Sequence, residues 1–171
     1  PIADMQFLEW LENNLDALLA RDPKALGYAV QRSCEIKAYV VSQDERDVGM
    51  RAALNFGHTF GHAIEAGLGF GEWLHGEAVG CGMVMAAHLS QRLGLVDMDF
   101  VKRLTHLLDR AGLPVVGPKL GADNYLQHMR VDKKSQGGEI RFVLIDPPGR
   151  AVVRGAPDTL VADVINHCCA G

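Results

Sequence analysis

The chain has 171 residues, of which 48% are hydrophobic and 22% are charged, so it can bury the core of one globular domain. Seventeen basic and twenty-one acidic residues give a net charge of −4, which argues against nucleic acid or an anionic membrane surface as a partner. No apolar run approaches the roughly 20 residues that a membrane-spanning helix needs.

The chain start and the cysteines indicate a compartment. No basic segment followed by an apolar stretch opens the sequence, so we expect no signal peptide in this chain. The four cysteines have spacings that fit neither a disulfide framework nor a zinc knuckle, which favours a reducing cytoplasm. The first residue is Pro1 rather than Met, so we expect a piece of a longer protein.

Helical periodicity dominates the chain from its start. A stripe of leucines predicts a first helix with Asp4 as its cap, and Asp22 before Pro23 predicts the start of a second. A charged connection is expected over residues 42–49, and three glycines are expected to end the third helix. We expect helices over residues 7–19, 23–41, 51–66, 74–93, 100–111, 123–129 and 158–168, the last capped by Asp158.

The β signal is confined to the C-terminal region. Residues 139–145 and 151–154 flank Asp146-Pro-Pro-Gly149, which is the pattern of a hairpin. The expected fold class is therefore mainly α, a single helical domain over residues 1–171 with one small C-terminal β-hairpin. The sequence contains no strand, glycine loop and helix in succession, so we expect no dinucleotide binding by this chain itself.

Three histidines are concentrated in one stretch. His58 and His62 are four residues apart, so on a helix they share one face and can bind one metal ion, or divide metal binding and proton transfer between them. A glycine-rich turn would bring His75 back toward that face. An isolated pair of this spacing is often incidental, but more polar residues flank it and favour a site. These flanking residues are Arg51, Asn55, Glu65 and Glu77.

A few single residues exclude or indicate other functions. Thr59 stands where a zinc protease has its glutamate base, which excludes that class. Lys37, Arg51 and the pair Lys133-Lys134 form a basic set, whose ordinary interpretation is a solvated surface. The lysine pair precedes the hairpin in a loop that contains glycine, and such loops often carry ligand contacts.

The histidine stretch resembles a known family. Leu54-Asn-Phe-Gly-His-Thr-Phe-Gly-His-Ala-Ile-Glu65 and Trp73-Leu-His-Gly-Glu-Ala-Val79 are similar to the C-terminal domain of 3-dehydroquinate synthase. The similarity continues through Asp132-Lys-Lys134 and covers essentially the whole chain. It implies the helical half of a two-domain lyase of the shikimate pathway, on the route to chorismate and the aromatic amino acids. That enzyme converts 3-deoxy-D-arabino-heptulosonate 7-phosphate into 3-dehydroquinate and phosphate.

The resemblance also implies cofactors and partners. The family uses NAD and a zinc or cobalt ion, and its members are commonly cytoplasmic homodimers. Its NAD-binding domain, and a glutamate that is the third metal ligand, correspond to sequence upstream of Pro1. We therefore expect that this chain requires that N-terminal domain as its partner, and that alone it neither binds NAD nor catalyses the reaction.

Site roles follow from the matched positions. His58 and His75 match the metal ligands, and His62 matches a proton acceptor. Asp47 stands where the family usually has a glutamate that is proposed as a second proton acceptor, and its side chain is shorter by one methylene. Substrate contacts are implied for Lys37, for Arg51 and Asn55, which are one turn apart on one helix face, and for one lysine of the pair Lys133-Lys134, of which we prefer Lys133.

Three alternatives stay open at this point. A sibling sugar-phosphate cyclase would form 2-deoxy-scyllo-inosose or an epi-valiolone with much of the same motif. A relative that only oxidises polyols, such as a glycerol dehydrogenase, is disfavoured by Asp132-Lys-Lys134 and by the hairpin. A non-catalytic helical assembly module would have no reason to keep the three histidines together with Arg51 and Asn55.

Overall fold

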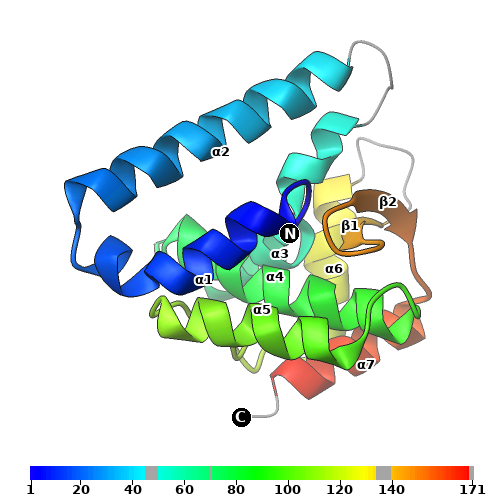
Figure 1. The fold of residues 1–171 in the computed structure, drawn as a ribbon. Helices are drawn as coiled ribbons and strands as arrows, with labels where there is room; N and C mark the ends of the chain where they lie inside the picture. The colour runs from blue at the N-terminus through cyan, green and yellow to red at the C-terminus, as the bar shows by residue number, and fades with distance from the viewer. Residues whose placement is uncertain (45–49, 70, 134–139, 170–171) are drawn as a thin grey trace.

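A computed structural model describes residues 1–44, 50–69, 71–133 and 140–169 (Figure 1). Helices predominate, and two short strands near the C-terminus form an antiparallel hairpin. The elements are α1 (Met5–Leu19), α2 (Pro23–Asp44), the 3₁₀ helix η1 (Met50–Asn55), α3 (His58–Leu68), α4 (His75–Arg92), α5 (Met98–Arg110), α6 (Ala122–Lys133), β1 (Arg141–Ile145), β2 (Ala151–Gly155) and α7 (Asp158–Cys168). The expected fold class is confirmed.

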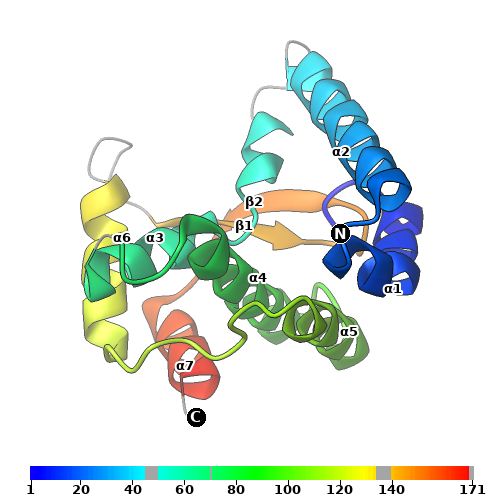
Figure 2. The same cartoon turned by 90° about the vertical axis from the view of Figure 1, so that its left-hand side faces the viewer.

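The first two helices begin where their capping residues predict. The Asp4 carboxylate accepts a hydrogen bond from the Phe7 amide at 2.8 Å, and Asp22 accepts one from the Ala25 amide at 2.8 Å. Helix α2 runs to Asp44, so the expected charged connection begins later than residue 42. Figures 1 and 2 show α2 standing apart from the other helices, with only α1 and η1 beside it.

The third expected helix is interrupted, which corrects the prediction of one helix over residues 51–66. Residues 50–55 form η1, and α3 begins only at His58. Gly57 lies between them with φ 87°, a left-handed conformation that favours glycine. A Cβ atom on Gly57 would lie 2.7 Å from the backbone nitrogen of Met83, and one on Gly82 would lie 2.2 Å from the Gly57 carbonyl oxygen. The break therefore lets α3 and α4 approach closely.

Helix α4 is the centre of the fold. It packs against α3, α5, α7 and β1, and most of its residues from Ala78 to Ser90 are buried, as its composition predicts. The buried Ser90 hydroxyl donates to the Ala86 carbonyl at 2.9 Å and accepts from the Ile145 amide at 3.0 Å. This bond attaches the hairpin to the central helix, so the sheet covers one side of the core (Figure 2).

The positions of the remaining helices and strands agree with those predicted from the sequence, but the capping residue of one helix differs. Asp97 caps α5 by accepting from the Phe100 amide at 2.8 Å. Asp158 does not cap α7, because Pro157 is the capping residue and the Asp158 carboxylate forms an ion pair with Arg130. All four cysteines are free thiols. Among the helices that the structure describes, none is long and apolar enough to cross a membrane.

Candidate active site

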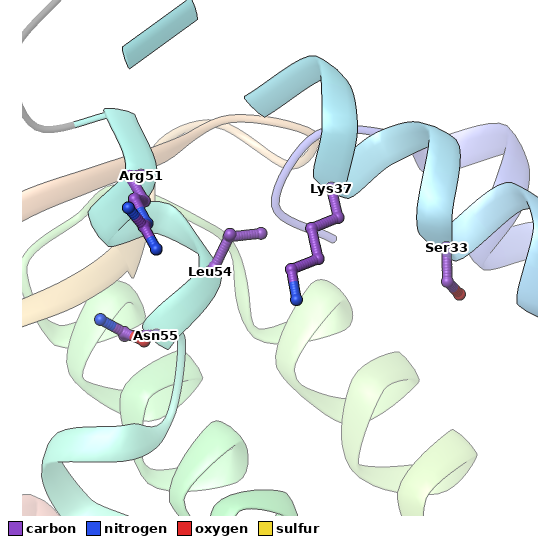
Figure 3. Close-up of a pocket in the computed structure, with 5 residues that line it drawn as sticks. All are labelled: Ser33, Lys37, Arg51, Leu54 and Asn55. Atoms are coloured by element: carbon purple, nitrogen blue, oxygen red, sulfur yellow. The ribbon is translucent and has the colours of Figure 1, made fainter. Parts of the chain in front are cut away.

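A pocket of about 510 Å³ lies between α2 and η1 and collects three of the expected substrate contacts. It is lined by Ser33, Lys37, Arg51, Leu54 and Asn55. Figure 3 shows Lys37 extending from α2 toward η1, while Arg51 and Asn55 come from η1 itself. Two cationic side chains and one amide therefore face the same space from two elements.

The pocket depends on tertiary packing as well as on helix spacing. Ser33 and Lys37 are four residues apart on α2, which places them on one face one turn apart. Arg51 and Asn55 were expected one turn apart on an α-helical face, but η1 is a 3₁₀ helix with about three residues per turn. They nevertheless line the same pocket. Ser33 was not predicted as part of a site, because nothing in the sequence indicates that this face of α2 packs beside η1.

A cluster of three imidazoles forms beside the junction of α3 and α4. The ring centroids of His58 and His62 lie 5.6 Å apart, those of His58 and His75 lie 5.5 Å apart, and those of His62 and His75 lie 5.9 Å apart. Three imidazoles on one tetrahedral zinc ion, with Zn–N distances of about 2.0–2.1 Å, would have centroids about 5 Å apart. The arrangement is thus close to that of three ligands around one ion.

The surroundings of His58 favour the neutral form of its ring, which is the form that binds metals. Its Nδ1 atom is buried and has no hydrogen-bond partner among the described residues. Burial lowers the pKa of His58 below its usual value, and the nearby His62 and His75 lower it further. The backbone carbonyls of Phe56 and Asn55 oppose this change but do not outweigh it. A neutral imidazole with an unused nitrogen fits a metal ligand.

Glu65 adds a carboxylate to the cluster. Its two oxygens lie 3.1 and 3.3 Å from Nδ1 of His75. One donor atom from each of His62, Glu65 and His75 can be chosen so that all three lie within 4.8 Å of one another. Nitrogen and carboxylate donors are what zinc and cobalt accept. The residues present therefore fit a divalent metal ion.

The pocket and the imidazole cluster are close along the chain. Asn55 ends η1 and His58 begins α3, and three residues span at most about 11 Å. The intervening Phe56 and Gly57 are buried, so this segment is packed against the core. Asn55 of the pocket and His58 of the cluster therefore lie no more than about 11 Å apart along the backbone.

Two expected site residues are not placed. Asp47 lies outside the described residues, as does Lys134. Lys133 is the last residue of α6, but its side chain is not among those described. Their roles stay predictions.

Four further histidines lie outside the cluster. His106 is exposed and His128 is half-buried. His88 and His167 form an unexpected pair between α4 and α7, with ring centroids 4.8 Å apart.

Comparison with known proteins identifies the family. Residues 1–135 match the family described as "3-dehydroquinate synthase C-terminal". A solved 2-epi-5-epi-valiolone synthase, ValA from Streptomyces hygroscopicus subsp. jinggangensis 5008 with NAD⁺ and Zn²⁺ bound, is 21% identical with a TM-score of 0.86. The match covers 99% of this chain and 48% of that protein.

Two solved structures of 2-deoxy-scyllo-inosose synthase share the fold as well. One, a complex with carbaglucose-6-phosphate, NAD⁺ and Co²⁺, is 24% identical with a TM-score of 0.71 over 85% of this chain and 43% of that one. The other is 24% identical with a TM-score of 0.68 over 86% of this chain and 41% of that one. The chain thus spans about half the length of the solved structures that it matches.

Proposed function

The chain belongs to the 3-dehydroquinate synthase C-terminal family, and from this premise we propose that it is the metal- and substrate-binding half of an enzyme that makes 3-dehydroquinate. The proposed reaction converts 3-deoxy-D-arabino-heptulosonate 7-phosphate into 3-dehydroquinate and inorganic phosphate. The observation that carries the proposal is the pocket with Lys37, Arg51 and Asn55 near the three-imidazole cluster.

The pocket suits a substrate with two anionic groups. Lys37 lines the pocket from α2 and Arg51 lines it from η1. Each can bind a carboxylate or a phosphate by a charge-assisted hydrogen bond. The Asn55 amide can donate to and accept from a sugar hydroxyl. A seven-carbon sugar acid phosphate carries both a carboxylate and a phosphate. The phosphate ester of a sugar without a carboxylate carries only the phosphate.

The histidines are proposed to divide the chemistry. His58 and His75 would hold the metal ion, and His62 would accept the proton that becomes acidic next to the newly formed carbonyl, after which phosphate leaves by β-elimination. When bound, the metal ion polarises the hydroxyl that is oxidised, and NAD supplies the transient oxidation. Asp47 would be a second proton acceptor, and Lys133 a further substrate contact.

The rest of the enzyme is part of the proposal. The N-terminal domain would bind most of the NAD and supply the remaining metal ligand and further lysines. The active site would then lie between the two domains. We expect a cytoplasmic homodimer for the complete protein, as in the family that the sequence resembles.

Product analysis with the polypeptide that joins this chain to an N-terminal NAD-binding domain tests the proposal. Supplied with 3-deoxy-D-arabino-heptulosonate 7-phosphate, NAD and zinc, it should release one phosphate for each molecule of 3-dehydroquinate, identified by mass spectrometry. Turnover of this substrate must fall sharply on His62→Ala. The proposal fails if the phosphate ester of a sugar without a carboxylate is converted and the sugar acid phosphate is not.

That failure would favour the sibling cyclases. The structural similarity to the epi-valiolone and deoxy-scyllo-inosose synthases makes them the alternative function. Their products lack the carboxylate of 3-dehydroquinate, so the mass of the product distinguishes the two possibilities directly.

A further inference from the structure

Glu65 makes a contact within the imidazole cluster that none of the proposed roles uses. Its carboxylate oxygens lie 3.1 and 3.3 Å from Nδ1 of His75. The Glu65 side chain is only 15% exposed, while that of His75 is 57% exposed. A fixed, mostly buried carboxylate therefore holds one nitrogen of a more exposed imidazole.

The fold brings these two residues together from different helices. Glu65 lies near the C-terminal end of α3, and His75 is the first residue of α4. The Glu77 carboxylate accepts a hydrogen bond from the Leu74 amide at 2.8 Å, which fixes the start of α4 just before His75. Since α3 and α4 pack closely together, the position of Glu65 relative to the His75 ring is set by the backbone of both helices.

The contact decides which nitrogen of His75 carries a proton. An ionised carboxylate only accepts hydrogen bonds, so Nδ1 of His75 must be the donor. In the neutral ring, Nε2 is then the nitrogen with the free lone pair. The rings of His58 and His62 lie 5.5 and 5.9 Å from that of His75. Histidines that bind metals commonly give their other nitrogen to a carboxylate in this way.

We propose that Glu65 is a positioning residue: its carboxylate fixes the tautomer and the orientation of His75 so that Nε2 is the metal-binding nitrogen. This inference rests on the proposed metal-binding role of His75. A competing arrangement uses Glu65 itself as a ligand with His62 and His75, because donor atoms of these residues lie within 4.8 Å of one another. That arrangement omits His58, whose buried Nδ1 has no partner among the described residues.

Nitrogen NMR on the metal-free 171-residue chain tests the tautomer. At an alkaline pH, where the His75 ring is neutral, it should carry its proton on Nδ1. Glu65→Gln should remove this preference, and Glu72→Gln, an exposed carboxylate before α4, should leave it unchanged. A wild-type His75 with its proton on Nε2, or an unchanged preference in Glu65→Gln, overturns the inference.

Cobalt titration tests the consequence for the metal. Glu65→Gln removes the carboxylate that holds His75, and it should weaken Co²⁺ binding by roughly 10- to 100-fold. The visible absorption spectrum at saturation should stay the same, because the ligands are unchanged. A changed spectrum in Glu65→Gln would show that Glu65 is itself a ligand. An unchanged Co²⁺ affinity would show that Glu65 does not support metal binding. Either result overturns the inference.

The two measurements separate this inference from the proposed function. If the wild-type chain binds no Co²⁺, the titration is repeated on the polypeptide that includes the N-terminal domain, because that domain is proposed to supply the remaining metal ligand. No Co²⁺ binding there would contradict the metal-binding role of His75, while the NMR result still decides whether Glu65 sets the tautomer. Circular dichroism checks that each variant is folded. If Glu65→Gln does not fold, Glu65→Asp gives both measurements with a shorter carboxylate, which should hold Nδ1 less well.

Discussion

Charge at the pocket comes from side chains that are far apart in the sequence. Lys37 lies on α2 and Arg51 on η1, and only the packing of these two elements places them around one space (Figure 3). Arginine can bind an anion through two parallel hydrogen bonds, whereas lysine acts as a compact point charge. The two positions are therefore suited to different anionic groups of one substrate.

Removing either charge should reduce substrate affinity more than turnover. In the complete two-domain enzyme, Lys37→Met and Arg51→Met should each raise KM by roughly 10- to 100-fold, since a hydrogen bond to a charged group contributes about 1.5–3 kcal/mol. Lys24→Met is the matched control, because Lys24 is an exposed lysine on the same helix and does not line the pocket. Steady-state kinetics at fixed ionic strength measures the effect.

The kinetics of these variants also test whether the pocket binds the anionic groups of the substrate. If KM for the sugar acid phosphate were unchanged in both, the pocket would not bind its carboxylate or phosphate. If Lys24→Met raised KM as much as Lys37→Met, the effect would be one of overall charge and not of this site.

At the residue level, part of the site could be predicted and part could not. The convergence of His58 and His62 follows from their spacing on a helix, and the glycine turn before His75 indicated the third imidazole. The link between Lys37 and Arg51 came from family resemblance, because nothing in local spacing indicates that α2 packs beside η1. Ser33 was missed for the same reason.

At the level of elements, helix starts were predictable and one break was not. Asp4 and Asp22 indicated the starts of α1 and α2, because their carboxylates satisfy backbone amides that a helix start leaves unpaired. The break at Gly57 was missed because the apolar pattern continues through it. The break accompanies the close approach of Gly57 to Gly82 on α4, which only the tertiary structure reveals.

The contact between α4 and α7 should make stability depend on pH. Burial, together with the neighbouring His167 and Arg92, lowers the pKa of His88 from 6.5 to about 4. Between these values the unfolded chain binds more protons than the folded chain, so the free energy of unfolding falls as the pH falls from about 6.5 to about 4. At about 1.4 kcal/mol per unit of pKa difference, the loss from His88 amounts to roughly 3 kcal/mol.

Replacing the buried imidazole isolates this effect from the titration of carboxylates. Urea unfolding of the wild type and of His88→Gln, from about pH 7 to about pH 4, should show a shallower pH dependence in the variant. His106→Gln removes an exposed histidine and should keep the wild-type dependence. Equal dependence in the wild type and His88→Gln would mean that His88 protonates as easily in the folded chain as in the unfolded chain.

At the level of the whole molecule, the described residues form a pocket with two cationic side chains and an imidazole cluster, but no nucleotide-binding unit. Their sheet is a two-stranded antiparallel hairpin, and no described strand is followed by a glycine loop and a helix that could cradle a pyrophosphate. The chain spans about half the length of its structural neighbours, two of which were solved with NAD⁺. Composition and periodicity predicted this fold class, because helix patterns and one hairpin signal dominate the sequence.

The division of ligands between two halves leads to a prediction for the isolated 171-residue chain. A ligand that binds the folded state at a concentration 100 times its Kd raises the free energy of unfolding by about 2.7 kcal/mol. Zinc should therefore raise the melting temperature through the imidazole cluster, and NAD should leave it unchanged. The zinc effect should disappear in His75→Ala and persist in His106→Gln. An increase with NAD alone would show that this half binds the dinucleotide by itself, and would contradict the proposed division between the two domains.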